Sequence, residues 1–249
     1  MAAMPSRGTS GWRAVGYKLL LGLAVFGIVV GGWSAVRFRI TMHSPLPDAG
    51  GRQGRCVLWF VGSSSVHRWT TLAADMAPWI TRNRGVDGAL LPELRRRFAN
   101  EDVSVPPEAI VFYGGDNDIA RGQSAADTVD QFRQFLAAKM DKMPDVPMLV
   151  ISVKPSPARW PIRGIQRSYD NALRAMAAND RRLTFVDTEA GLLVGGRPGP
   201  FFKADGLHLN PDGYRVWARI TRQTLAASLP QAVVNRCTGS TSIRKAQAR

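Results

Sequence analysis

Cysteine and histidine are scarce in this sequence of 249 residues, and their scarcity limits the chemistry that the chain can perform. The two cysteines, Cys56 and Cys237, are too few and too far apart in sequence to suggest a metal site. They are either two unrelated buried thiols or, if the domain lies outside the cytoplasm, a disulfide that attaches the C-terminal tail to the domain. The three histidines are His43, His67 and His208, so only these positions can supply an imidazole base.

Acidic residues are also few, 19 against 33 basic residues, and the formal net charge is +14. A charge of this size can indicate nucleic-acid binding, but most of the excess lies in two flanks, residues 1–54 and 231–249. A basic flank beside a membrane segment more often meets anionic lipid or stays solvated. Because no nucleic-acid recognition motif accompanies the charge, we expect no nucleic-acid partner.

The sequence has a single hydrophobic run of membrane-spanning length, residues 19–36, which reads LLLGLAVFGIVVGGWSAV. Its 18 uncharged residues would form about 27 Å of helix, just enough to cross the hydrocarbon core of a bilayer. A cleaved signal peptide is the alternative, but the run is long for one and no clean A-x-A site follows it. We therefore expect a single-pass signal anchor between a basic segment at 1–18 and a Gly- and Pro-rich linker at 37–54.

Short apolar runs alternate with helical patterns between residues 55 and 230, and a basic tail follows at 231–249. Continuous apolar runs predict buried strands at 56–61, 79–81, 109–115, 147–153 and 183–187. Helical patterns occur at 66–77, 89–98, 124–140, 165–179 and 211–229. The last begins with Asn210 as a cap and Pro211 at the first helical position. The alternation predicts an α/β three-layer sandwich, in which a parallel sheet of about five strands carries helices on both faces.

Polar or glycine-rich segments follow the predicted strands, and ligands of parallel sheets bind at the carboxyl ends of the strands. These segments are GSSS (62–65), RNRGVDG (82–88), GGDND (114–118), KPSPARW (154–160) and ADGLHLN (204–210). We expect them to meet on one rim of the sheet. Each has a simpler explanation when taken alone, such as a serine helix cap or an Asp-Gly turn. Their order along the chain favours a shared site.

A serine hydroxyl at this rim needs a base in contact and donors for the developing oxyanion. His208 is the candidate base, because Asp205 precedes it by three residues and can orient its ring. His43 lies in the predicted linker, and His67 is expected to point away from the serines. In the fourth segment, Lys154, Arg159 and Trp160 form either a wall of the substrate site or a structural loop with solvated charges.

Residues 55–228 resemble the SGNH hydrolases, the group that includes the GDSL esterases and lipases. The segment VGSSS resembles the first block of the family, which makes Ser64 the nucleophile. Ser63 stands where the family usually has aspartate, and Ser65 is therefore the alternative nucleophile. The resemblance implies a flavodoxin-like SGNH hydrolase fold.

The other three blocks supply the remaining site residues that the resemblance implies. NRGVDG places Gly88 in the oxyanion hole, and GGDND places the Asn117 amide there, beside the backbone N–H of Ser64. DGLH supplies Asp205 and His208 to the triad. Asp87 stands beside Gly88 where related sequences often carry glycine, and we expect its carboxylate to point outward.

The resemblance implies a serine esterase that needs no metal and no organic cofactor. We expect a carboxylic-ester substrate, with acetylated carbohydrate of the cell envelope preferred. A lipase or lysophospholipase and an acyltransferase are alternatives with the same residues. A membrane-anchored module that binds without catalysis is the alternative from another class. We expect a location at the cell membrane, with the domain on the extracytoplasmic side, and the sequence predicts no oligomeric state.

Overall fold

The computed structural model describes residues 26–27, 29–33, 44–48 and 54–239 of the chain. The chain divides into two units, Met1–Ser44 and Pro45–Arg249. In the first unit, residues 26–27 and 29–33 are helical and exposed, and they cover part of the segment predicted as a signal anchor. The rest of that segment, the basic segment 1–18, His43 and most of the predicted linker lie outside the described residues. Within the described ranges, no helix combines the length and the apolar character that a membrane crossing requires.

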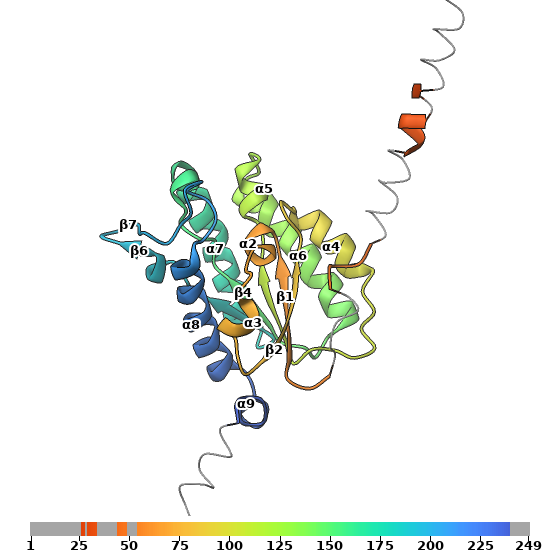
Figure 1. Cartoon of the computed structure of the whole chain (residues 1–249), viewed down its shortest axis with the longest axis vertical. Helices are drawn as coiled ribbons and strands as arrows, with labels where there is room; N and C mark the ends of the chain where they lie inside the picture. Colours follow the sequence, from red (N-terminus) through yellow and green to blue (C-terminus); the bar gives the residue numbers. More distant parts are fainter. Residues whose placement is uncertain (1–25, 28, 34–43, 49–53, 240–249) are drawn as a thin grey trace, which may run out of the picture. The chain divides into compact units, whose positions relative to one another are not determined.

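The second unit is built on a parallel sheet of five strands in the order β2-β1-β3-β4-β5, as the α/β prediction required (Figure 1). The strands are β1 (Val57–Gly62), β2 (Ile80–Gly85), β3 (Ala109–Tyr113), β4 (Met148–Ile151) and β5 (Leu183–Val186). A two-stranded ribbon of β6 (Leu193–Val194) and β7 (Arg197–Pro198) follows β5. Strand β2 lies on one side of β1, and β3, β4 and β5 follow on the other side. In open sheets of this kind, ligands bind where the order changes in this way, here between β1 and β3.

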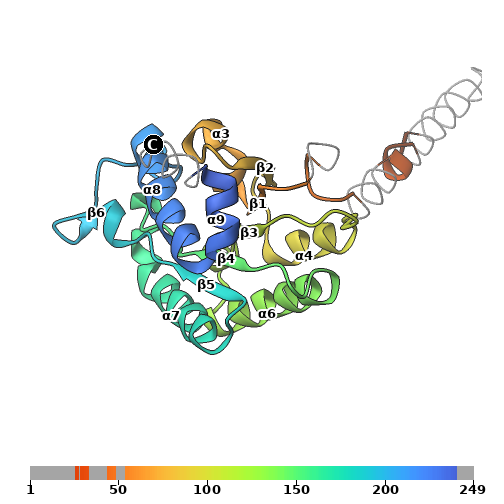
Figure 2. The same ribbon diagram turned by 90° about the horizontal axis from the view of Figure 1, so that it is seen from below.

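Helices cover both faces of the sheet, and Figure 2 shows α8 and α9 on one face with α4, α6 and α7 on the other. The helices are α2 (Ser64–His67), α3 (Leu72–Asp75), α4 (Leu91–Ala99), α5 (Asp116–Ala120), α6 (Ala125–Lys142), α7 (Arg163–Asn179), α8 (Pro211–Ser228) and α9 (Gln231–Thr238). Short 3-10 helices lie at η1 (Pro157–Ile162) and η2 (Ala190–Leu192).

Alternate residues of the strands pack into two apolar clusters, one on each face of the sheet. In β1, Trp59 and Val61 belong to the apolar cluster beneath α4, α6 and α7. Leu58 and Phe60 belong to the cluster beneath α3, α8 and α9. Because successive strand residues point to opposite faces, an unbroken apolar run is the sequence of a strand that is covered on both sides.

Two local predictions were wrong. Strand β2 continues to Gly85 rather than ending at residue 81, so the first part of the segment RNRGVDG is strand and not loop. Its charges are tolerated there because Arg82 pairs with Asp48 and Arg84 pairs with Glu101.

The helix predicted at 66–77 is interrupted. Helix α2 ends at His67, and α3 begins only at Leu72. Between them the chain buries the side chain of Trp69, whose indole N–H donates a hydrogen bond of 2.6 Å to Asp75. The chain therefore leaves the helical conformation between α2 and α3, at the point where it buries this large side chain.

The compact unit is longer at both ends than the predicted domain of residues 55–230. It starts at Pro45, and Leu46 is buried with its backbone N–H donated to the Glu101 carboxylate. At the other end α9 packs on the core, and Cys237 forms a disulfide with Cys56 across a Cα–Cα distance of 5.2 Å. Of the two alternatives for the cysteines, the structure has the disulfide.

Candidate active site

Ser64 lies at the first turn after β1, where the chain passes from strand to helix. The backbone N–H of Ser63 donates to the Tyr113 carbonyl at 3.2 Å, and the Ser63 carbonyl accepts from the N–H groups of Val66 and His67. These bonds fix the turn at the end of β1. Figure 1 shows α2 and α5 at the same end of the sheet, opposite α9, as expected for the carboxyl ends of the strands.

His208 lies against Ser64 although 144 residues separate them. Its Nε2 is 3.1 Å from Ser64 Oγ, and its Nδ1 is 2.7 Å from Asp205 Oδ2. Ser64 and His208 are 8% and 7% exposed, so the contact is shielded from bulk water. The three side chains thus form one continuous line of contacts, in which the imidazole can accept the hydroxyl proton while the carboxylate orients the ring.

The Asp205 carboxylate is fixed and charged. Its Oδ1 accepts the backbone N–H groups of Leu207 at 2.8 Å and His208 at 2.9 Å, so it caps the turn that carries the histidine. Burial raises the pKa of Asp205, but the hydrogen bonds from the His208 ring and from these two N–H groups outweigh burial and hold the pKa below its usual value. Asp205 therefore remains an anion that can stabilise an imidazolium at Nδ1.

The structure places the other serine and histidine of this segment away from the contact between Ser64 and His208. Ser65 is fully buried, and its hydroxyl has no hydrogen-bond partner among the described residues. Its carbonyl accepts the Tyr214 hydroxyl at 3.0 Å, which attaches α8 to the turn. Nδ1 of His67 lies 3.3 Å from the Gly85 carbonyl, so the ring faces β2. The geometry favours Ser64 over Ser65.

The two other residues expected in the oxyanion hole lie close together, Asn117 in the first turn of α5 and Gly88 in the loop that precedes α4. Asn117 Nδ2 donates to the carbonyl of Ala89 at 3.0 Å, which places the amide against the residue after Gly88. Gly88 has a φ of 69°, which glycine adopts without strain, and a Cβ there would meet no atom within 4 Å. Gly115, at φ 94°, starts the helix that carries Asn117. The space beside Gly88 is therefore open.

Asp87 points away from this space, as expected. Its two carboxylate oxygens accept Nε and Nη2 of Arg68, each at 3.0 Å. The hydrogen bond from Arg68 lowers the pKa of the Asp87 carboxyl. This negative charge is therefore paired with Arg68 at the surface.

A buried ionic cluster lies at the ends of β3 and β4, and the sequence analysis missed it. Asp116, at the start of α5, accepts Lys154 Nζ at 2.9 Å and Arg159 Nη1 at 2.8 Å. It also accepts the Tyr113 hydroxyl and Gln166 Nε2, each at 2.9 Å. Burial raises the pKa of Asp116, but the two cations outweigh burial and lower it to about 2. The sequence did carry a signal for this cluster, because the acidic Asp116 and the basic Lys154 and Arg159 follow the ends of neighbouring strands.

This cluster corrects both alternatives for Lys154, the first residue of the segment KPSPARW. Lys154 is 1% exposed, so it is neither solvated nor a wall of an open site. Arg159 is 16% exposed at its side chain, and its Nη2 donates to Asn117 Oδ1 at 2.9 Å. Trp160 is partly exposed, with the guanidinium of Arg197 lying 6.0 Å from its ring centre.

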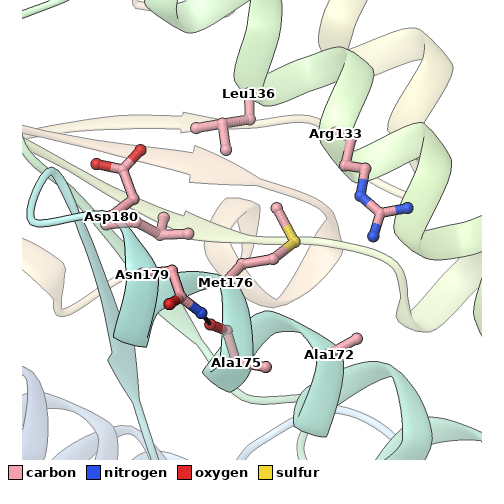
Figure 3. A pocket seen from close by; sticks show the side chains of 8 residues that line it. Arg133, Leu136, Ala172, Ala175, Met176, Asn179 and Asp180 are labelled. Atoms are coloured by element: carbon pink, nitrogen blue, oxygen red, sulfur yellow. Dashed lines mark hydrogen bonds between the residues drawn. The ribbon is translucent and has the colours of Figure 1, made fainter.

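A pocket of about 490 Å³ lies between α6 and α7, beside the start of β5 (Figure 3). Its lining includes Leu136, Met176 and Leu183 together with Arg133 and Asp180. None of the residues expected in the active site lines it. Within the described part of the chain, the group with spacing suited to a metal ion is Cys56, Glu108 and Cys237, and its two sulfurs are joined in the disulfide.

Comparisons with known proteins agree with this fold. The family model for GDSL-like lipases and acylhydrolases matches residues 51–216. No curated protein matches the chain. Among solved structures, a protein from Streptococcus pneumonia superposes with a TM-score of 0.63 at 15% identity, covering 85% of this chain and 99% of its own.

Two further structures have the same fold. A GDSL-like lipase from Bacteroides thetaiotaomicron has a TM-score of 0.60 at 21% identity, with 73% of this chain and 94% of its own covered. A carbohydrate esterase family 3 protein from Talaromyces cellulolyticus has a TM-score of 0.54 at 17% identity, with 72% and 98% covered. At these identities the likeness concerns the fold.

Proposed function

Because the chain belongs to the GDSL-like lipase/acylhydrolase family, we propose that it hydrolyses carboxylic esters with Ser64 as nucleophile, His208 as base and Asp205 as the orienting anion. One observation carries the proposal. Ser64 Oγ lies 3.1 Å from His208 Nε2 while the opposite nitrogen of the ring contacts Asp205 at 2.7 Å. A serine hydroxyl is activated by an adjacent base that a third group holds in orientation.

The first half of the proposed reaction forms an acyl-enzyme. Ser64 Oγ attacks the ester carbonyl carbon, and its proton passes to His208 Nε2. Asp205 keeps the proton of the ring on Nδ1 and stabilises the imidazolium. His208 then donates its proton to the departing alkoxide, so that an alcohol leaves and the acyl group remains on Ser64.

The tetrahedral oxyanion of this step receives hydrogen bonds from three donors in the proposal. These are the backbone N–H groups of Ser64 and Gly88 and the side-chain amide of Asn117. Loss of one such donor typically costs about 2.7–4 kcal/mol in the transition state. In the second half, water attacks the acyl-enzyme with His208 again as base, and the carboxylic acid leaves. The steps require no metal or organic cofactor.

For the substrate, we favour an acetyl group on carbohydrate of the cell envelope. A carbohydrate esterase among the proteins with this fold supports this choice, and a GDSL-like lipase among them keeps a long acyl chain as the alternative. The disulfide between Cys56 and Cys237 supports an extracytoplasmic domain, because such bonds persist in oxidising compartments. The uncharged segment 19–36 supports a membrane anchor on the same chain.

The proposal is tested with the purified full-length chain and a fluorophosphonate probe. Wild type and Ser65→Ala should be labelled, whereas Ser64→Ala should not. Hydrolysis of nitrophenyl esters from acetyl to dodecanoyl, beside acetylated xylan and a lysophospholipid, then identifies the acyl group, and acetyl esters should be cleaved fastest. Labelling that survives Ser64→Ala but is lost in Ser65→Ala would assign the nucleophile to Ser65.

An unlabelled and inactive wild type would instead favour a binding module without catalysis. Preference for dodecanoyl esters or for the lysophospholipid would favour a lipase. Acyl transfer to an added sugar that outpaces hydrolysis would favour an acyltransferase. Each outcome retains the fold and changes only the reaction assigned to the site.

A further inference from the structure

The guanidinium of Arg159 bridges two neighbouring residues at the start of α5. Its Nη1 lies 2.8 Å from Asp116 Oδ2, and its Nη2 lies 2.9 Å from Asn117 Oδ1. Arg159 itself comes from η1, after β4, so the bridge joins the ends of two strands. Arginine alone among the side chains presents parallel donors in a rigid fork, which suits it to this double contact.

The bridge determines how the Asn117 amide is oriented. Arginine has donors and no acceptor, so the group of Asn117 that faces Arg159 must be the carbonyl Oδ1. The amide nitrogen then points the opposite way, where it donates one hydrogen to the Ala89 carbonyl at 3.0 Å. An amide nitrogen carries two hydrogens, and the second is available to a ligand beside Gly88.

The rest of the cluster holds Arg159 in place and leaves it with positive charge. Asp116 shares its single negative charge between Arg159 and the buried Lys154, so neither cation is neutralised fully. The backbone N–H of Ala158 donates to the Gly206 carbonyl at 2.9 Å, which attaches the η1 segment to the loop that carries His208. A cation on Oδ1 withdraws electrons from the amide and strengthens Nδ2 as a donor.

We propose that Arg159 is a positioning residue that orients and polarises the Asn117 amide, so that Asn117 Nδ2 donates to the oxyanion during ester hydrolysis. The inference rests on the proposed function and adds to it a residue that does not touch the substrate. Arg159 acts only through Asn117, and this restriction makes the proposal testable.

The test is a double-mutant cycle on kcat/KM for nitrophenyl acetate, with the full-length chain. Arg159→Met should lower kcat by about 10- to 100-fold with KM little changed, less than the 10²- to 10³-fold expected for Asn117→Ala. In the Asn117→Ala background, Arg159→Met should cost less than about 3-fold. Arg174→Met is the matched control, because it removes an arginine from an exposed ion pair with Asp187, and it should leave kcat unchanged.

A lysine at position 159 separates charge from geometry. In Arg159→Lys the charge beside Asp116 remains, but a lysine cannot contact both Asp116 and Asn117. The lysine variant should therefore regain less than a tenth of the kcat that is lost in Arg159→Met. Full restoration by lysine would overturn the proposal, as would an Arg159→Met effect of equal size with and without Asn117.

A second readout is independent of activity and of folding yield. The side-chain amide signal of Asn117 in a ¹⁵N-asparagine spectrum, assigned by its loss in Asn117→Ala, should shift in Arg159→Met and stay in place in Arg174→Met. An unmoved signal would overturn the contact. An inactive wild type in which the signal still shifts would overturn the proposed function while supporting the contact.

Discussion

Asp116 and Glu101 are both buried carboxylates paired with arginine, yet their surroundings shift their pKa values in opposite directions. Asp116 meets two cations, and although burial raises its pKa, Lys154 and Arg159 lower it to about 2. Glu101 meets Arg84, and there burial outweighs the arginine and raises the pKa of the carboxyl. Both cations near Asp116 form direct ion pairs with its carboxylate, whereas at Glu101 Arg84 alone among the described residues does so, and Lys142 acts without an ion pair.

The Asp116 cluster and the Glu101 pair also differ in which parts of the structure they connect. The Asp116 cluster contacts Asn117 and lies at the carboxyl ends of the strands. Glu101 accepts the backbone N–H of Leu46, and its own carbonyl accepts Lys142 Nζ at 2.8 Å, so it attaches the start of the domain to the core. The comparison indicates that substitutions at the strand ends should reduce activity, whereas substitutions around Glu101 should reduce stability.

The largest expected effect tests the activity side of this comparison. Asp205→Asn should lower kcat by about 10⁴-fold, because the amide cannot hold His208 in the reactive tautomer. The midpoint of urea unfolding should change little, since the Asp205 side chain is 44% exposed. Asp130→Asn, in an exposed ion pair with Arg133, is the control and should change neither quantity. A large loss of stability in Asp205→Asn would break the comparison.

The next effect tests the stability side. Glu101→Gln leaves the buried Arg84 without its counter-charge, and the free energy of unfolding should fall by about 3–5 kcal/mol. Urea denaturation with an unchanged m-value measures this loss, and kcat of the folded enzyme should stay at the wild-type value. Glu93→Gln, which breaks a partly exposed i,i+4 pair with Arg97, should cost less than about 0.5 kcal/mol. Equal costs for the two variants would contradict the expectation.

The disulfide should have a smaller effect of the same kind. Replacement of Cys56 and Cys237 by serine should lower the free energy of unfolding by about 2–4 kcal/mol, because the unfolded chain regains the freedom that the bond removes. Wild type in reducing agent should unfold at the same urea concentration as the variant, which should itself be insensitive to reducing agent. Turnover should be unaffected, since the bond lies at the amino end of β1 and the serine at its carboxyl end.

Asp170 sharpens the comparison as a third buried carboxylate. It accepts the Val153 N–H at 2.9 Å and lies 3.5 Å from Arg163, which is also paired with Glu189. Burial raises its pKa to about 7. A raised pKa means that the folded state holds the proton more tightly than the unfolded state. The stability that Asp170 contributes is therefore full below about pH 4 and is lost as the pH rises through 7.

The measurement is the free energy of unfolding between pH 4 and pH 8 for wild type and Asp170→Asn. The difference between the two proteins should change by about 1–3 kcal/mol across this range, with wild type favoured at the acid end. Parallel curves would show that Asp170 is ionised throughout, as Asp116 is.

The sequence predicted the sheet and most helices because their signals are local. The run at 56–61 is apolar throughout, and β1 is buried along its whole length. Asn210 and Pro211 predicted the start of α8, where Asn210 Oδ1 accepts the Gly213 N–H at 3.0 Å. The order of the motifs led us to expect Ser64 beside His208, and the structure brings these side chains into contact. Their catalytic roles remain predictions.

The features that the sequence did not predict depend on partners that are distant in sequence. Arg82 and Arg84 made β2 look like a loop, because no nearby residue indicated that Asp48 and Glu101 would pair with them. Lys154 was expected in a wall of the substrate site or as a solvated charge for the same reason, and only the pairing of β3 with β4 brings it to Asp116. Burial of a charge is decided by tertiary contacts, which composition and periodicity do not report.

The bond between Cys56 and Cys237 spans 181 positions and so closes nearly the whole domain into a covalent ring. A protease that cuts once in any loop inside this ring produces two pieces that stay linked through sulfur. The nicked chain would keep its mass under non-reducing electrophoresis and separate into fragments only after reduction. Outside the cell, where proteases are common and reductants are rare, a single cut would not release any part of the sheet from the rest.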